Sequence, residues 1–244
     1  MRNKDELIAG FEETMSLILD SEAFAKYSEM KLGLNLKEYG MLIKTDIDEL
    51  LSIIKSRNYN SIADVGCGTG ELIEHISKHT KAKCTGFDLS HKVITKLNHK
   101  KSNNLVYSVG DIETGIEGLF DIVICVDVLY FVENLENALN QLINITKSKG
   151  ICIIYYSDHH LLKNKEPIVE RHLKSLQLSY NVSDITKHEE ISWKDSLNAL
   201  EKLDSEFMNE GLAEFAKMMK NEAIECLEKN KEFSAKRFRY IIEK

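Results

Sequence analysis

The sequence predicts an α/β fold, in which a doubly wound, mostly parallel sheet of seven strands carries helices on both faces. Short apolar runs alternate with amphipathic segments from about residue 60 to residue 160, as in β-α-β units. A glycine-rich turn follows the first of these runs and precedes the first amphipathic segment. Aspartates follow the ends of several runs, and this is the edge where parallel sheets bind their ligands.

The composition excludes some classes of function. The chain has 244 residues and a formal net charge of −7, which argues against a general nucleic-acid binder, because neutralising phosphates requires a basic surface. No apolar run is long enough to span a bilayer, and no signal-peptide core follows the first residues. The five cysteines form no C-x-x-C pair, and no His/Cys cluster has zinc spacing. We therefore expect a cytoplasmic protein with no metal, no membrane and no nucleic acid as partner.

Two amphipathic helices are expected before the sheet. Apolar residues recur at helical spacing over residues 5 to about 20 and again over residues 41–56. We interpret residues 1–56 as a helical cap, which either packs on the sheet edge or closes over a bound ligand. Tyr27 and Tyr39, between the two helices, would line the pocket in the second case and pack half-buried in the first.

The glycine-rich turn carries the clearest chemical signal. It reads DVGCGTGE over residues 64–71, between an apolar strand and a helix, so its backbone N–H groups lie at a helix N-terminus. Its glycines are spaced G-x-G-x-G, whereas nicotinamide-binding turns have G-x-G-x-x-G. Asp64 would repel a pyrophosphate and attract an ammonium group.

Three later strands are each followed by an acidic residue. The strands are expected at residues 83–87, 105–109 and 120–126, and the acids are Asp88, Asp111 and Asp127. Ser90 is expected to cap the helix that runs to about residue 101. A helix from Asn134 is expected to close with Lys147, Lys149 and Gly150, before a fifth strand at residues 151–156.

The turn resembles motif I of the class I S-adenosylmethionine (SAM)-dependent methyltransferases. Residues 87–90 resemble the acidic second motif of that family, and residues 120–129 resemble its motif IV. The resemblance implies a turn that wraps the amino-acid end of SAM, with ribose, adenine and the methyl donor at the next three strand ends. The implied residues are Asp64, Gly66, Cys67, Gly68, Thr69 and Gly70 in the turn, Asp88 and Leu89 at ribose, Asp111 and Ile112 at adenine, and Asp127 and Val128 beneath the donor.

The C-terminal part extends this sheet. A helix is expected over residues 161–176, a sixth strand over 178–184 and a last strand over 237–242. This order resembles small-molecule methyltransferases whose last two strands are separated by helices. We therefore divide the chain into the cap, a core of residues 57–184, a helical insertion of residues 185–232 over the active site, and a final strand within residues 233–244.

The leading hypothesis for function is transfer of the sulfonium methyl of SAM to an N, O, C or S nucleophile of a small molecule, with S-adenosylhomocysteine as product. Pro167 is the single proline, so neither the proline pair of nucleobase amino-methyltransferases nor a Pro-Cys nucleophile is present. A catalytically inactive SAM-binding partner subunit is the second hypothesis. A nicotinamide-dependent oxidoreductase is the third, and the glycine spacing disfavours it. The chain is expected to be a monomer or a homodimer.

A side-chain base is needed only if the acceptor arrives protonated. The fifth strand delivers His159 and His160 to the ligand-binding edge, and the unperturbed pKa of histidine lies near ~6.5. Tyr130, just after motif IV, is the alternative acceptor-site residue.

Overall fold

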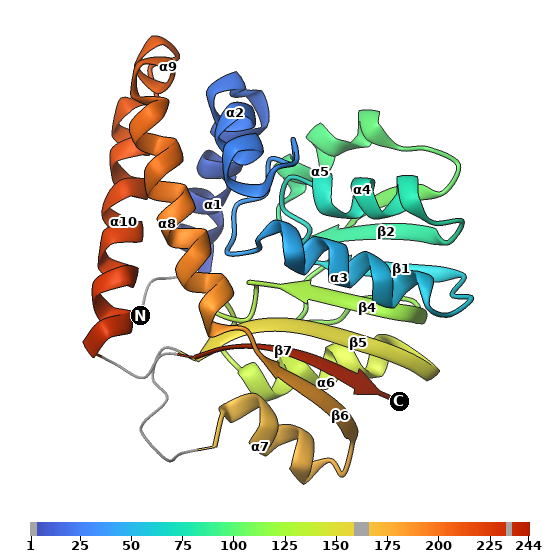
Figure 1. Ribbon diagram of the computed structural model, residues 1–244. Coiled ribbons are helices and arrows are strands. Elements are labelled where there is room, and N and C mark those ends of the chain that lie inside the picture. The colour runs from blue at the N-terminus through green and yellow to red at the C-terminus, as the bar shows by residue number, and fades with distance from the viewer. Residues whose placement is uncertain (1–3, 159–165, 233–235) are drawn as a thin grey trace.

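One mixed sheet of seven strands forms the centre of the described protein, as the sequence predicts (Figure 1). The computed structural model describes residues 4–158, 166–232 and 236–244. The strand order is β3-β2-β1-β4-β5-β7-β6; β7 runs antiparallel to both of its neighbours, and the other pairs are parallel. The strands are β1 (Ser61–Val65), β2 (Lys83–Asp88), β3 (Leu105–Val109), β4 (Phe120–Val126), β5 (Thr146–Asp158), β6 (Ser179–Asp184) and β7 (Lys236–Glu243).

Helices cover both faces of the sheet and continue beyond it (Figure 1). Those packed in the first of two hydrophobic cores are α1 (Lys4–Asp20), α2 (Glu22–Leu32), α3 (Lys44–Lys55), α4 (Glu71–His79), α5 (His91–Leu97), α8 (Thr186–Lys202), α9 (Asp204–Asn209) and α10 (Ala213–Glu232). The second core, on the opposite face, takes α6 (Leu135–Ile145) and α7 (Ile168–Ser175).

The pleat of β5 shows how one strand serves both cores. Ile151, Ile153 and Tyr155 belong to the first core, and the alternate residues Cys152 and Ile154 belong to the second. All five are at most 3% exposed. A strand buried on both faces has to be apolar along its whole length, which explains why the sequence shows a continuous apolar run here.

Helix α2 was not predicted, although its end signals are present. Ser21 is its N-cap, and the hydroxyl of Ser21 accepts a hydrogen bond from the backbone N–H of Phe24 at 2.9 Å. Gly33 ends the helix in the left-handed conformation, at φ 66°. The hydrophobic spacing within α2 is weak because its buried face contains Tyr27, Ser28 and Lys31, and this polar face hid the helix.

The predicted end of α6 was wrong. The helix stops at Ile145, and β5 begins at once with Thr146, four residues before Gly150. A Cβ on Gly150 would lie 2.7 Å from the Asp121 carbonyl oxygen, so this glycine allows two strands to approach closely rather than ending a helix. The pairing of β4 with β5 shifts register at this place, between Phe120 and Ile122.

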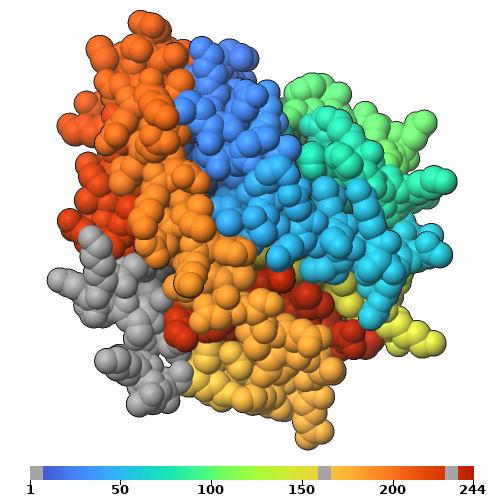
Figure 2. Space-filling model, viewed as in Figure 1, coloured from blue at the N-terminus to red at the C-terminus, as the bar shows by residue number. Residues whose placement is uncertain are grey.

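Helices α8, α9 and α10 form the insertion between β6 and β7. Helix α8 packs along α10 and against α2, so that the insertion and the N-terminal helices share one core (Figure 1). In the space-filling view their surfaces meet without a break (Figure 2). Among the described residues, no helix is both long and apolar enough to cross a lipid bilayer.

Candidate functional site

The turn between β1 and α4 depends on three glycines in the left-handed region. Gly66, Gly68 and Gly70 have φ values of 79°, 49° and 71°. The backbone N–H groups of Gly66 and Cys67 both donate to the Phe87 carbonyl oxygen at 2.8 Å, which holds the turn against the end of β2.

Close packing fixes two of these glycines and leaves the third accessible. A Cβ on Gly66 would lie 2.2 Å from Cγ2 of Val128, and one on Gly70 would lie 2.7 Å from the ring of Tyr107. A Cβ on Gly68 would meet only the sulfur of Met15 in α1, at 3.6 Å. The side of the turn at Gly68 is therefore the one on which a ligand can approach the backbone, and α1 covers it.

Asp64, the last residue but one of β1, is a buried carboxylate surrounded by negative charge. Its exposed fraction is 3%. Burial, together with the nearby carboxylates of Asp88 and Glu38, raises the pKa of Asp64 to about 7. Within the part of the chain that the structure describes, both charged groups that act on the pKa of Asp64 are thus acids.

Asp88 ends β2 beside Asp64 and clamps the glycine turn. Its Oδ2 accepts from the backbone N–H of Gly68 at 3.0 Å, and its Oδ1 accepts from that of Ser90 at 2.9 Å. Burial raises the pKa of Asp88, and these backbone donors oppose the rise. The hydroxyl of Ser90 accepts from the Val93 N–H at 3.1 Å, which confirms the predicted cap of α5.

The predicted adenine residues follow β3. Oδ1 of Asp111 accepts from the backbone N–H of Glu113 at 2.8 Å, and the carbonyl of Asp111 accepts from that of Gly115 at 2.9 Å. Ile112 is buried, whereas Leu89, in the loop after β2, is half-buried. Cys67 and Thr69 of the turn are both buried.

Asp127, directly after β4, is bonded to the protein through both carboxylate oxygens. Nη1 of Arg237 donates to Oδ1 at 2.6 Å, and Nη2 donates to Oδ2 at 2.9 Å. The side chain of Arg237 is 0% exposed, and the Asp127 charge raises its pKa against the effect of burial. The backbone N–H of Met41 also donates to Oδ2, at 3.0 Å. The carboxylate of Asp127 therefore ties the end of β4 to β7 and to the backbone at Met41.

Tyr130 is likewise engaged with its neighbours. Its hydroxyl accepts from the backbone N–H of Ser157 at 2.6 Å and donates to Asp127 at 3.3 Å. The hydroxyl of Ser157 donates to Glu189 of α8 at 2.6 Å and accepts from Arg237 at 3.1 Å. This chain of polar groups joins the ends of β4 and β5 to the start of β7 and to α8.

A short loop between α2 and α3 crosses the same edge of the sheet. The backbone N–H of Lys37 donates to Glu71 Oε2 at 2.7 Å, at the first residue of α4. Four residues later, Met41 reaches Asp127. The segment 37–41 therefore runs from the glycine turn to the end of β4, above the end of β1.

The two cap tyrosines, Tyr27 in α2 and Tyr39 in the loop after it, both contact the insertion. The hydroxyl of Tyr27 hydrogen-bonds to that of Ser196 at 2.7 Å, and Tyr27 is 4% exposed. The ring of Tyr39 stacks on Phe215, with centroids 6.4 Å apart, and its hydroxyl donates to Glu222 at 3.4 Å. Both residues therefore join the cap to the insertion. His159 and His160 lie outside the described residues.

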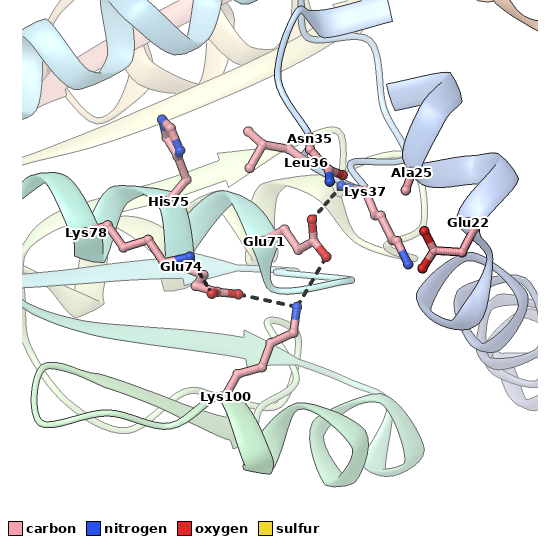
Figure 3. A pocket seen from close by; sticks show the side chains of 10 residues that line it. All are labelled: Glu22, Ala25, Asn35, Leu36, Lys37, Glu71, Glu74, His75, Lys78 and Lys100. Carbon is pink, nitrogen blue, oxygen red and sulfur yellow. Dashed lines mark hydrogen bonds and ion pairs between the residues drawn. The ribbon is translucent and has the colours of Figure 1, made fainter. Parts of the chain in front are cut away.

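A hollow of about 410 Å³ lies between α4 and residues 35–37, where the loop from α2 begins to cross the sheet edge (Figure 3). Glu71 points from α4 toward both the loop and Lys100, and Lys100 lies 3.3 Å from Glu71 and 3.3 Å from Glu74. Glu74 also pairs with Lys78 at 2.7 Å. Glu71 and Glu74 are thus already paired with lysines. The hydrogen bond from the Lys37 backbone N–H to Glu71 fastens the loop to α4 beside this hollow.

Sequence reasoning missed four charged groups of the site: Lys31, Glu38, Glu189 and Arg237. A signal existed for the last of these. Arg237 and Arg239 alternate with Phe238 and Tyr240 along β7, so a strand with an apolar face on one side has two guanidinium groups on the other. Guanidinium groups inside a sheet need buried acids as partners.

Comparison with known proteins finds a methyltransferase domain in the middle of the chain. Residues 63–154 match the family model described as "Methyltransferase domain". The ubiquinone biosynthesis O-methyltransferase of Rickettsia bellii is 31% identical over 131 residues, which cover 48% of this chain and 53% of that protein. Over the matched residues the chain is similar to the class I SAM-dependent methyltransferases. The chain spans about half the length of the curated relatives that it matches.

Solved structures show the same fold over more of the chain. A cyclopropane synthase from Mycobacterium tuberculosis superposes with a TM-score of 0.71 at 13% identity, covering 96% of this chain and 98% of that one. The phosphoethanolamine N-methyltransferase 2 of Haemonchus contortus, solved with phosphomonomethylethanolamine and S-adenosylhomocysteine, gives a TM-score of 0.68 at 14% identity and covers 80% of this chain and 52% of that one. At such identities the likeness shows the methyltransferase fold alone.

Proposed function

We propose that this protein binds SAM and transfers its sulfonium methyl to a small-molecule nucleophile. The observation that carries the proposal is the pair of buried carboxylates, Asp64 and Asp88, on neighbouring strand ends at the base of the glycine turn. An adenosyl-methionine ligand offers an ammonium group and two ribose hydroxyls, which are the partners that two such carboxylates need.

The residues of the site fit this cofactor. Asp64 is buried among acids and gains a favourable partner if it receives an ammonium group. Asp88 accepts two backbone N–H groups and, as a carboxylate with two oxygens, has lone pairs left for ribose hydroxyls. Gly68 offers its backbone without a side chain on the accessible side of the turn. Asp111 and Ile112 would hold the adenine.

Bound SAM would supply a methyl group that is already activated by its sulfonium sulfur. The protein then has to align donor and acceptor and to exclude water. We assign alignment to the rigid strand ends: Asp64 and Asp88 hold the donor, while Val128 packs on Gly66 from the end of β4. The Asp127–Arg237 pair keeps that end of β4 in place.

Water exclusion is assigned to the cap and the insertion. Helix α1 covers Gly68 through Met15, and segment 37–41 covers the end of β1. We propose that residues 1–56 and residues 185–232 act together as a lid, joined through Tyr27 and Ser196. A lid of this thickness favours a small acceptor over a macromolecule. An acceptor with an acidic proton could use Tyr130, His159 or His160, as the sequence suggests.

Titration calorimetry tests the proposal. The purified protein should bind SAM and S-adenosylhomocysteine and should not bind NAD. Binding of NAD without SAM would overturn the assignment. Transfer of a tritiated methyl group to an acceptor then separates an enzyme from a SAM-binding partner subunit. Both would bind the cofactor, but the enzyme alone would transfer its methyl group.

A further inference from the structure

Segment 37–41 brings one carboxylate over the centre of the site. Its two anchors, Lys37 to Glu71 and Met41 to Asp127, fix the backbone on either side of Glu38. A Cβ on Gly40 would lie 2.2 Å from Oε1 of Glu38 and 3.0 Å from Oδ2 of Asp127. The Glu38 carboxylate therefore lies beside that of Asp127, and its charge also acts on Asp64 at the end of β1.

The two oxygens of Glu38 differ in their surroundings. The backbone N–H of Gly40 hydrogen-bonds to the Glu38 carboxylate, next to Oε1. Oε2 is buried and accepts no hydrogen bond from the part of the chain that the structure describes. A buried carboxylate oxygen without a donor is costly, so an unoccupied lone pair here indicates a ligand group that completes it.

The nearest cation does not fill this position. The ammonium of Lys31, in α2, donates to the Gly40 carbonyl oxygen. Burial lowers the pKa of Lys31, and the charges of Glu38 and Asp127 oppose that change. The other nearby cation, Arg237, is already held by both oxygens of Asp127.

We propose that Glu38 is the acceptor-side catalytic residue, whose Oε2 binds the N–H or O–H of the nucleophile and takes its proton during methyl transfer. The inference rests on the proposed function. The nucleophile forms a bond to the methyl carbon, the carbon–sulfur bond breaks with its electron pair going to sulfur, and the proton of the nucleophile passes to Glu38. One sulfonium and one carboxylate become a neutral thioether and a neutral carboxyl, so charge balances.

The charges around Glu38 also select the acceptor class. Groups that face it are Lys31 and Tyr27 from α2, Asp64 from β1, Asp127 after β4 and Arg237 from β7. With Arg237 paired to Asp127 and Asp64 facing the ammonium group of the donor, a carboxylate acceptor would lie against Glu38 and would offer its Oε2 no hydrogen-bond donor. The site therefore takes an amine or a hydroxyl compound and rejects a carboxylate as nucleophile.

Burial raises the pKa of Glu38 to about 7, with Asp127 raising it and Lys31 and Arg237 lowering it. A base with this pKa is protonated below neutral pH and becomes active as the pH rises through about 7. At saturating SAM, kcat should rise over the same range.

Two cofactor analogues test the position of Glu38 without an acceptor. Sinefungin carries an amine-bearing carbon where SAM carries its methylated sulfur, whereas S-adenosylhomocysteine has no charge there. Calorimetry of Glu38→Gln should show affinity for sinefungin reduced by about tenfold, with affinity for S-adenosylhomocysteine within about threefold of the unaltered protein. Glu38→Asp, which keeps the charge, should restore most of the sinefungin affinity. Glu29→Gln, which changes an exposed acid of the preceding helix α2, is the matched control and should change neither affinity.

The outcomes separate the two proposals. If the unaltered protein binds neither analogue, the proposed function fails. If it binds both and Glu38→Gln weakens both alike, or weakens neither, the role of Glu38 alone is refuted. Binding of S-adenosylhomocysteine by the variant also shows that the variant folds. A methyl ester as the product of whichever acceptor is found would overturn the acceptor class.

Discussion

Arg237 and Asp127 form a bidentate ion pair that reaches across the end of a strand. The N–O distances are 2.6 and 2.9 Å, and the two residues belong to β7 and to the end of β4, with β5 lying between them in the sheet. Because β7 is antiparallel to β5, its first residues lie at the same edge as the carboxyl ends of the parallel strands. The reversed direction of one strand thus delivers a cation to the ligand-binding edge.

Breaking this pair should be strongly destabilising. Arg237→Met leaves Asp127 buried without its cation, and we expect a loss of about 3–5 kcal/mol in the free energy of unfolding. Lys236→Met is the matched control, because Lys236 forms an exposed pair with Asp184 at 3.2 Å, worth at most about 1 kcal/mol. Urea denaturation of both variants measures the difference. Equal losses in the two variants would contradict a special role of the buried pair. Adding Asp127→Asn to Arg237→Met should recover part of the stability, because no unpaired charge is then left buried.

The turn should tolerate no side chain at Gly66. Gly66→Ala places a Cβ 2.2 Å from Val128 in a backbone with φ 79°. Steric overlap and backbone strain together should lower the free energy of unfolding by about 2–4 kcal/mol. Gly115→Ala has positive φ but no atom within 4 Å, and should cost about 1–2 kcal/mol from strain alone. Thermal melts of both variants check this order. If adding Val128→Ala to Gly66→Ala restored nothing, the overlap would not be the cause.

Cofactor binding should release a proton near neutral pH. The pKa of Asp64 is raised to about 7 without ligand, and an ammonium partner would lower it, so binding favours the ionised form. Affinity for SAM should therefore rise with pH between about 5.5 and 7. Calorimetry in buffers of different ionisation enthalpy counts the released protons. Asp64→Asn should bind more weakly and release fewer protons; an unchanged proton count would refute the link.

The same raised pKa makes a prediction for stability. The folded protein holds its proton on Asp64 more tightly than the unfolded chain does, so this contribution is complete below pH ~4 and is lost as the pH rises toward about 7. Unfolding free energy of the ligand-free protein should fall over this window, by an amount on the order of 2–4 kcal/mol. Asp64→Asn should flatten the dependence. Chemical denaturation at several pH values provides the measurement.

The cap and the insertion should open together. Glu210, after α9, accepts from the Ser21 hydroxyl at 2.6 Å and from the Ala23 N–H at 2.8 Å, which ties the insertion to the start of α2. Limited proteolysis should cut within about residues 20–40 and 185–232, more slowly with S-adenosylhomocysteine and faster in Glu210→Ala. Cutting at the same rate with and without ligand would identify these helices as fixed scaffold.

Much of the sheet could be predicted because the strands β1 to β4 are short, mostly apolar runs that end at charged or glycine residues. β4 was placed at its observed limits, since Asp121 and Asp127 bracket its apolar run. Helix α2 was not, because its buried face is polar. The end of α6 was misplaced because Gly150 lets two strands approach closely and does not end a helix. A glycine can do either, and the sequence alone does not show which.

The site was predictable where chemistry follows a local motif. Asp64, Asp88 and the three glycines lie within 25 residues of one another, and their spacing alone brings them together. Glu38 and Arg237 are 199 positions apart and meet only through the fold, so no local pattern could pair them. The acceptor-site role of Tyr130 stays a prediction, and its bonds to Ser157 and Asp127 are tertiary contacts that no local pattern shows.

Segment 37–41 is held at both ends by backbone N–H groups, and the side chains of Lys37 and Tyr39 add contacts of their own. Any amino acid other than proline can make these two bonds. The side chain at position 38, which takes part in neither bond, can therefore change while the sheet, the glycine turn and the lid stay unchanged. Exchange of this five-residue segment is the smallest graft that we expect to redirect a methyltransferase of this architecture to a new acceptor.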